Sequence, residues 1–302
     1  MLRQNMTSGT KILVVGGNGV LGTKLLALLG PERAVAATRR KDWNAGQFEH
    51  VVLADAADID AAPWHRFNSV INVAGRVNGD RQELDEANIT VPVKLAKAAR
   101  ANGMPHFVQV SSFSVYGLAE LIDNSSPEAP VSDYGWSKLD GDQQLLALAT
   151  ENFSVATLRL PFLFDADQAA LFEPLFKVIK RLPFFPVGPD STRRSMISYT
   201  DAARTLAHVA VGHRDGVFHA AAPTLFDFEL LGRLLEDETA FRFRTMRLPQ
   251  SVVALIKLVA PTINRRLFQS SVLSADLNIA ADVAGLSDIE LPLRLLINKH
   301  FL

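Results

Sequence analysis

The sequence predicts an α/β protein: a doubly wound parallel sheet with a smaller C-terminal lobe. Strand-like and helix-like segments alternate through the first half, which is the pattern of βαβ units. A glycine-rich turn joins the first strand to the first helix, as such units require. Right-handed crossovers then place helices on both faces of the sheet. Beyond Leu160 prolines become frequent and the alternation weakens, which marks the lobe.

The expected strands of the sheet are short apolar runs bounded by turn residues. They are Lys11–Val15, Ala34–Thr38, His50–Ala54, Ser69–Val73, His106–Ser111 and Ser154–Leu160. Helical spacing of apolar residues predicts helices over Val20–Leu29, Asp85–Asn102 and Tyr134–Thr150. We expect one domain over residues 10–165 and, over 166–302, a mostly substrate-binding lobe with segments that return to the sheet.

The second half contains weaker versions of the same signals. We expect strands at Arg194–Tyr199 and Val217–Ala221, and helices at Thr200–Gly212, Asp227–Asp237, Gln250–Ala260, Ser274–Ala284 and Leu291–His300. The apolar run Val252–Ala260, followed by Arg265 and Arg266, permits two interpretations. It could be a helix that lies on a membrane surface, but we favour a buried helix with a basic loop.

Composition limits the classes of function. The chain has 302 residues, 48% of them hydrophobic, and a net charge of −1. This near-neutral balance disfavours nucleic acid and acidic membranes as partners. There is no cysteine, which excludes disulfides and thiolate chemistry. Residues 1–10 lack the apolar core of a signal peptide and no apolar run is long enough to span a bilayer, so we expect a cytoplasmic protein.

The most informative motif is the glycine turn, with Gly16, Gly19 and Gly22 spaced three residues apart. Val20 and Leu21 open the helix that follows it. Amides at a helix N-terminus bind phosphate, so this turn could hold the pyrophosphate of a dinucleotide. The alternative is a strand–helix turn that needs glycine only for its backbone geometry.

Two further motifs carry chemistry. Tyr134 and Lys138 are four residues apart on a helix, so their side chains share a face, and a nearby cation lowers the pKa of a phenol. The pair could therefore act as a general acid and base, although an exposed Tyr and Lys would look the same. Ser112 follows an apolar strand at the edge where such sheets bind ligands. It could equally satisfy turn amides.

Together, in this order, the glycine turn, Ser112 and Tyr134-x-x-x-Lys138 resemble the extended branch of the short-chain dehydrogenase/reductase superfamily. This branch comprises nucleotide-sugar epimerases, dehydratases and reductases with a Rossmann fold. The match covers residues 10–165 well and continues weakly through 193–202. The resemblance implies that Tyr134 donates and accepts the proton and that Lys138 lowers its pKa and binds the nicotinamide ribose. It implies that Ser112 polarises the substrate carbonyl or hydroxyl.

The resemblance also assigns contacts with the cofactor. Ala74 and Gly75 lie in a turn that contacts the cofactor, and Asn88 lies in the following helix. Asp55 is similar to an acid that contacts the adenine, unless it only caps the next segment. Arg39 and Arg40 follow the second strand, where guanidinium groups accommodate a 2′-phosphate and a carboxylate would select NAD. We therefore expect NADP, with NAD as the alternative.

The substrate is less well determined. Phe162 occupies the position of an asparagine that contacts the sugar in many epimerases, whereas Arg193 or Arg194 could bind a substrate diphosphate. We expect hydride transfer between nicotinamide and a secondary alcohol or ketone, first of all on a nucleotide-linked sugar. The alternatives are a carbonyl reductase of a smaller apolar substrate and a non-catalytic nucleotide sensor. No metal site is expected, and a homodimer is possible because helices 85–102 and 134–150 often pair in this superfamily.

Overall fold

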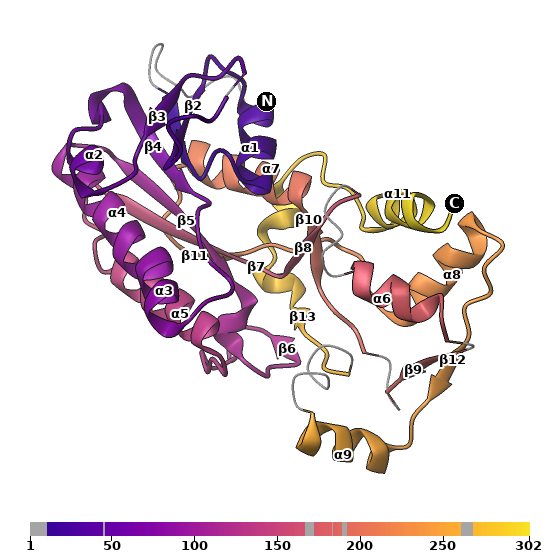
Figure 1. Ribbon diagram of the computed structural model, residues 1–302. Coiled ribbons are helices and arrows are strands. Elements are labelled where there is room, and N and C mark those ends of the chain that lie inside the picture. The colour runs from indigo at the N-terminus through magenta and orange to yellow at the C-terminus, as the bar shows by residue number, and fades with distance from the viewer. Residues whose placement is uncertain (1–10, 45, 167–171, 183, 189–191, 261–267) are drawn as a thin grey trace.

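A seven-stranded parallel sheet forms the centre of the computed structural model (Figure 1), which describes residues 11–44, 46–166, 172–182, 184–188, 192–260 and 268–302. The strands lie in the order β11-β7-β5-β4-β1-β2-β3. Their bounds are β1 Lys11–Val15, β2 Ala34–Thr38, β3 His50–Val52, β4 Phe67–Asn72, β5 His106–Ser112, β7 Ser154–Leu160 and β11 Gly216–His219. This confirms the predicted fold class.

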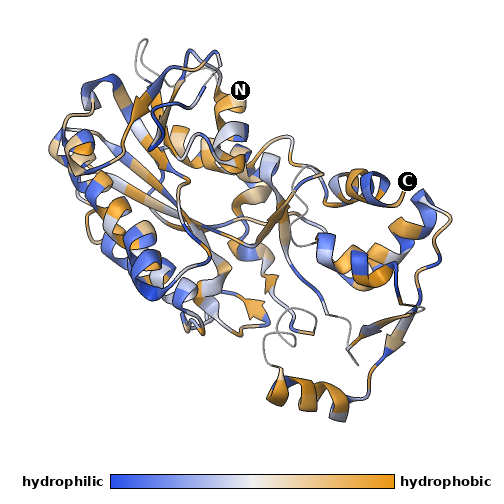
Figure 2. Ribbon diagram, in the orientation of Figure 1, coloured by the Kyte–Doolittle hydropathy of each residue, from blue (hydrophilic) through white to orange (hydrophobic). Residues whose placement is uncertain are grey.

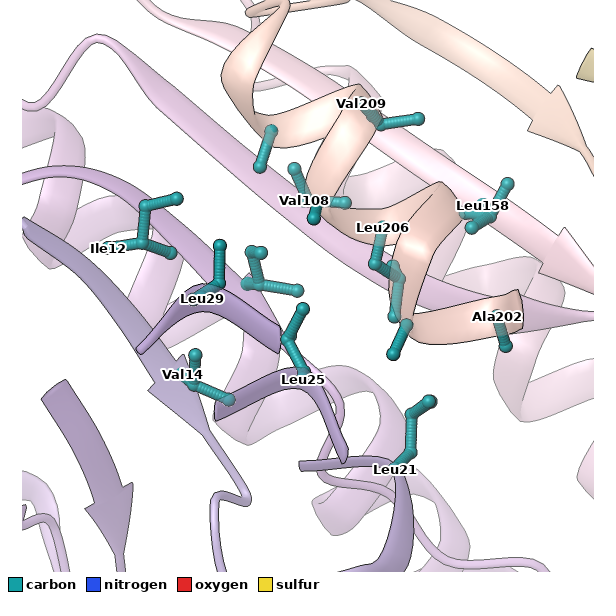
Figure 3. Close-up of a cluster of buried hydrophobic side chains, with 14 of the residues drawn as sticks. Ile12, Val14, Leu21, Leu25, Leu29, Val108, Leu158, Ala202, Leu206 and Val209 are labelled. Carbon is teal, nitrogen blue, oxygen red and sulfur yellow. The ribbon is translucent and has the colours of Figure 1, made fainter. Parts of the chain in front are cut away.

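Helices cover both faces of the sheet because its strands alternate apolar side chains between the two faces. Helices α1 (Val20–Leu29) and α7 (Tyr199–Val211) enclose a core with Val14, Leu25, Val108 and Leu206 on one face (Figure 3). The opposite face packs against α2 (Ala56–Asp60), α4 (Val91–Ala101) and α5 (Asp133–Leu146). Both α7 and β11 come from the second half of the chain and return to the sheet, as the sequence predicts.

The order of the strands locates the ligand-binding edge. The chain runs outward from β1 through β2 to β3 and then crosses back to β4 on the other side of β1. Ligands of open α/β sheets bind at the carboxyl ends of the strands where this reversal occurs. The glycine turn follows β1, and residues 73–75 follow β4. The two loops therefore meet at the predicted cofactor position.

The helix expected over Asp85–Asn102 begins earlier and changes pitch. Asp80 accepts a hydrogen bond from the amide of Glu83, whose side chain in turn accepts one from the amide of Asp80, and this capping box starts α3 (Arg81–Asp85). A π-helical turn, η2 (Glu86–Thr90), then leads into α4. Sequence periodicity at 3.6 residues per turn does not reveal such a turn.

The helix expected over Ser274–Ala284 is wrong. Two short 3₁₀ turns, η4 (Ala275–Leu277) and η5 (Ile279–Asp282), take its place. Asn278 between them is extended, and its side-chain amide exchanges hydrogen bonds with the backbone of Ala221. Contacts with the edge of the sheet therefore override the local helical pattern.

The C-terminal lobe, defined here as α6, β9, α8, β12, α9 and α11, has a core of its own. The bounds are α6 Phe172–Ile179, β9 Phe185–Val187, α8 Phe228–Glu238, β12 Thr245–Arg247, α9 Gln250–Val259 and α11 Glu290–Phe301. Phe164, Phe172, Phe176 and Phe228 are buried in this core together with leucines of α8 and α11. Two-stranded parallel pairs connect β9 with β12, β8 (Phe162–Phe164) with β10 (Met196–Ser198), and β6 (Leu121–Ile122) with β13 (Val272–Leu273).

Helix α9 differs from the expectation of a buried helix, because none of its side chains is buried. It forms at one extremity of the molecule, apart from the hydrophobic core of the lobe (Figure 1). Arg265 and Arg266, which follow it in the sequence, lie outside the described residues. Within the described part of the chain, no helix combines the length and the apolar character that crossing a membrane requires.

Candidate active site and cofactor cradle

The glycine turn has the geometry of a phosphate cradle. Gly16 has a φ of +84°, and a Cβ on Gly22 would lie 2.2 Å from the carbonyl oxygen of Gly16. Only glycine allows α1 to begin this close to the turn. Helix α1 starts at Val20, with no side-chain cap from Gly19 and no acidic residue in its first turn. Leu21 packs into the core. Because no side chain caps them, the first amides of α1 remain suited to bind an anion.

The end of β2 carries one exposed arginine and one arginine in an ion pair. Arg39 is exposed, whereas the guanidinium group of Arg40 lies 3.2 Å from the carboxylate of Asp42. Asp55 accepts hydrogen bonds from the amides of Ala57 and Asp58 through one carboxylate oxygen. Asp55 therefore acts as the N-cap of α2 in this structure, which is the simpler of the two roles that the sequence allows.

Asn88 fixes the loop that follows β4. Its side-chain oxygen accepts a hydrogen bond from the amide of Arg76 at 3.0 Å, and its side-chain nitrogen donates to the carbonyl of Arg76 at 2.8 Å. The same nitrogen donates to Ser137 on α5. The π-helical turn places Asn88 in this buried position. Ala74 and Gly75 are thereby held between the glycine turn and Lys138: a Cβ on Gly16 would touch Ala74, and a Cβ on Gly75 would lie 3.8 Å from Nζ of Lys138.

Ser112 and Tyr134 come together because α5 packs closely against the end of β5. Helix α5 is capped by Ser132, which accepts a hydrogen bond from the amide of Gly135. A Cβ on Gly135 would lie 2.6 Å from the carbonyl oxygen of Ser114, so glycine is required for this approach. The hydroxyl of Ser112 lies close enough to the phenol of Tyr134 to lower its pKa, while Ser112 donates its own proton to the hydroxyl of Ser114 at 3.1 Å. The two predicted catalytic hydroxyls are therefore adjacent at the carboxyl edge of the sheet.

The ionisation of Tyr134 corrects one expectation from the sequence. Burial raises the pKa of its phenol above the ordinary value, the nearby hydroxyl of Ser112 lowers it, and the negative charge of Asp142 raises it further. The expected lowering by Lys138 is absent, because Nζ of Lys138 is directed toward the carbonyl oxygen of Val110 at 2.6 Å. In this structure Tyr134 is therefore a neutral phenol at pH 7.

Lys138 is a buried ammonium group at the base of the site. Burial lowers its pKa to about 8, and the carboxylate of Asp142, one helical turn further along α5, partly opposes this shift. At pH 7 the group is still mostly charged. The ammonium group lies beside the loop that contains Ala74 and Gly75. Because its pKa of about 8 is close to neutral pH, a small change in its surroundings would change its charge.

A buried polar network beneath this site was not predicted as a unit. Asp142 accepts hydrogen bonds from Ser111 at 2.8 Å and from Nε of Arg159 at 3.0 Å. Arg159 also donates to the hydroxyl of Tyr116, which forms a 2.6 Å hydrogen bond with His219. The spacing of Lys138 and Asp142 was the available signal, because residues four apart share a helix face. Among the described residues, no group of His, Asp and Glu is placed to bind a metal ion.

Apart from Ser112, the predicted substrate residues lie in different environments. Phe162 follows β7, whose last residue Leu160 pairs with Ser112, and it is 49% exposed. Arg193 is exposed. Arg194 is largely buried: its Nε donates to the carbonyl of Gln269, and burial lowers the pKa of its guanidinium group to about 10. Arg193 is thus more accessible to an anionic ligand than Arg194.

Two enzymes of known activity are similar to this chain in sequence. The UDP-glucose 4-epimerase of Vibrio cholerae is 29% identical over 212 residues, which cover 62% of this chain and 62% of that protein. The match thus spans less than two thirds of that relative's length. The dTDP-glucose 4,6-dehydratase of Streptomyces griseus is 28% identical over 260 residues, which cover 75% of this chain and 78% of that protein.

A solved structure shares the fold over nearly the whole chain. The UDP-glucuronic acid 4-epimerase of Bacillus cereus, solved in complex with NAD, superposes with a TM-score of 0.70 over 97% of this chain and 100% of that chain, at 17% identity. Residues 12–222 also match the NAD dependent epimerase/dehydratase family as a whole. This stretch runs from β1 through β11 and contains the glycine turn, Ser112, Tyr134 and Lys138. The chain therefore belongs to the NAD dependent epimerase/dehydratase family.

Proposed function

We propose that this protein is a nicotinamide-dependent oxidoreductase or epimerase that acts on a nucleotide-linked sugar. The observation that carries the proposal is that the hydroxyls of Ser112 and Tyr134 lie together beside the buried ammonium of Lys138. These groups lie at the strand edge toward which the glycine turn also opens. A hydride donor at that edge would face an alcohol or ketone held by the two hydroxyls.

Each residue of this site has a distinct role in the proposal. Ser112 donates a hydrogen bond to the substrate oxygen and orients it. Tyr134, a neutral phenol at pH 7, donates the proton when a ketone is reduced and accepts it when an alcohol is oxidised. Lys138, a buried ammonium group one helical turn from Tyr134, binds the ribose hydroxyls. When bound, the nicotinamide supplies or takes up the hydride and, in its oxidised form, adds a positive charge near the phenol.

We propose that the cofactor is NADP rather than NAD. Support comes from Arg39, which is exposed directly after β2, where a 2′-phosphate would lie. Arg40 contributes less, because its guanidinium group is already paired with Asp42. The glycine turn and the free N-terminus of α1 serve either cofactor, so the discrimination depends on Arg39.

For the substrate, the accessible Arg193 supports a diphosphate, and the names of the relatives support a nucleotide sugar. A second candidate, a carbonyl reductase of an apolar ketone, is supported by the exposed ring of Phe162 beyond β7. An aromatic side chain there cannot make the hydrogen bond that an asparagine would give to a sugar.

The test compares these substrates directly. Purified protein is incubated with NADP or NAD and UDP-glucose, and separately with NADPH or NADH and an apolar ketone. Sugar products are followed by proton NMR, and reduction or oxidation of the cofactor is followed by absorbance. The proposal predicts an epimerised or oxidised nucleotide sugar. Reduction of apolar ketones with no turnover of any nucleotide sugar would support the second candidate. A homodimer and a cytoplasmic location stay predictions from the sequence.

A further inference from the structure

Helix α9 exposes apolar side chains that its own lobe does not cover. Leu255, Leu258 and Val259 are 58%, 79% and 68% exposed, and Val252 is 39% exposed. The preceding helix in the chain, α8, buries Leu230, Leu231, Leu234 and Leu235, among others. An isolated exposed leucine is ordinary on a protein surface, but an exposed cluster on one helix marks an interaction site.

The exposed side chains of α9 form one stripe. Val252, Leu255 and Val259 follow the i, i+3, i+7 spacing of a single helix face, with Leu258 at its border. Figure 2 shows hydrophobic colour along most of the α9 ribbon, and Figure 1 shows this helix at the outer end of the lobe. The stripe is therefore accessible to a large surface as well as to a small partner.

The stretch of sequence that contains this helix carries charge of only one sign. From Thr239 to Ala275 the sequence contains Arg242, Arg244, Arg247, Lys257, Arg265 and Arg266 but no Asp or Glu, although the whole chain has a net charge of −1. Arg242, Arg244, Arg247 and Lys257 lie in the described residues and are exposed. Only Arg247 has an acidic partner within 4 Å among these described cations, the exposed Glu229 at 3.6 Å.

We propose that α9, together with Arg242, Arg244 and Lys257, docks on an anionic lipid bilayer. The apolar stripe would enter the boundary between headgroups and acyl chains, while the cations contact lipid phosphates. With ten residues α9 is too short to cross a bilayer, so it lies in the interface. A symmetric contact between two copies would instead place this cationic segment against itself, which is unfavourable.

This inference is independent of the proposed reaction and reverses the expectation of no membrane partner. Near-zero net charge led to that expectation, but the average conceals a local excess of positive charge around α9. Peripheral docking would bring the C-terminal lobe to the lipid surface.

The test is vesicle flotation of the full-length protein. We expect the protein to float with vesicles of phosphatidylcholine and phosphatidylglycerol and to bind phosphatidylcholine vesicles alone at least about tenfold more weakly, with binding reduced by salt. Leu255→Asp with Leu258→Asp should lower the affinity for anionic vesicles at least about tenfold. The matched control is Leu291→Asp with Leu295→Asp on α11, whose leucines are 60% and 51% exposed, and it should bind like wild type.

Arg242→Gln with Arg244→Gln gives a second test that leaves the apolar stripe intact. It should weaken binding to anionic vesicles and reduce its salt dependence, so it carries the test if the aspartate variant does not fold. The proposal is overturned if wild type does not prefer anionic vesicles, or if the α11 control loses binding equally. It is also overturned if the α9 variant dissociates a dimer in sedimentation experiments while wild type binds no vesicles, because the stripe would then be an interface between two copies.

Discussion

The glycine turn and helix α9 differ sharply in how tightly the rest of the protein surrounds them. At Gly22 a single added carbon would lie 2.2 Å from a backbone oxygen, whereas no side chain of α9 is buried. The first region is adapted to a small ligand that binds backbone amides. The second has no internal partner for its apolar side chains. Under the two proposals, the first half of the chain binds its cofactor through backbone amides, whereas the lobe binds a lipid surface through exposed apolar and cationic side chains.

The largest effect is expected where the backbone has no space. Gly22→Val should displace the glycine turn and lower dinucleotide affinity more than about 100-fold, a loss of roughly 3 kcal/mol. Binding of NADP and NAD is measured by calorimetry. Gly212→Ala, at the end of α7 and outside the glycine turn, is the control. A Cβ there would lie 3.2 Å from the nearest atom, the carbonyl oxygen of His208, compared with 2.2 Å at Gly22. If the Gly22→Val protein folds and binds both dinucleotides with normal affinity, the glycine turn is not the cofactor site.

Lys138 links stability to pH. Its pKa is about 8 in the folded protein and 10.5 as a free side chain, so between these values the unfolded chain binds more protons. The free energy of unfolding of wild type should therefore rise with pH across this window, by up to roughly 3 kcal/mol relative to Lys138→Met. Urea unfolding of both proteins at several pH values measures the difference. A constant difference from pH 7 to pH 10.5 would show that burial does not shift this lysine.

A smaller effect is expected at Arg39, which is on the surface but beside the cradle. Arg39→Ala should weaken NADP binding about tenfold and leave NAD binding unchanged, because only NADP carries the 2′-phosphate. Arg40→Ala should change the ratio less, since Arg40 is paired with Asp42. If Arg39→Ala combined with Arg40→Ala keeps the same ratio of the two affinities, these arginines do not select the cofactor.

The smallest effect on folding is expected at α9. Leu255→Ala should change the free energy of unfolding by less than about 0.5 kcal/mol, because the side chain is exposed in the folded protein. Leu231→Ala, in the core of the same lobe, should cost about 2–5 kcal/mol. Chemical unfolding of both variants measures the contrast. Equal losses would show that α9 packs against the lobe.

The sequence predicted the sheet well because its strands are short apolar runs separated by turns. The bounds of β1, β2, β7 and α1 agree with the expected ranges. Sequence patterns fail where contacts between distant segments decide the local structure. Asn278 pairs with Ala221, and this contact prevents the helix expected at Ser274–Ala284. The exposure of α9 could not be inferred either, since its apolar spacing is also that of a buried helix.

For the site, the sequence identified residues but not their electrostatics. Ser112 and Tyr134 lie near each other in the structure, and their roles stay predictions. The raised pKa of Tyr134 depends on burial and on Asp142, and the direction of Lys138 depends on the carbonyl of Val110. These are three-dimensional quantities. Likewise, only the structure separates the exposed Arg193 from the half-buried Arg194.

The central claim is that Tyr134 moves the proton while the cradle holds the cofactor independently of it. Tyr134→Phe tests this most directly, measured in parallel for cofactor affinity and for turnover of the nucleotide sugar that wild type converts fastest. We predict affinity within about twofold of wild type and turnover reduced by at least about 100-fold. Turnover that survives the substitution at a normal rate would contradict the account and favour a protein that binds nucleotides without using this phenol.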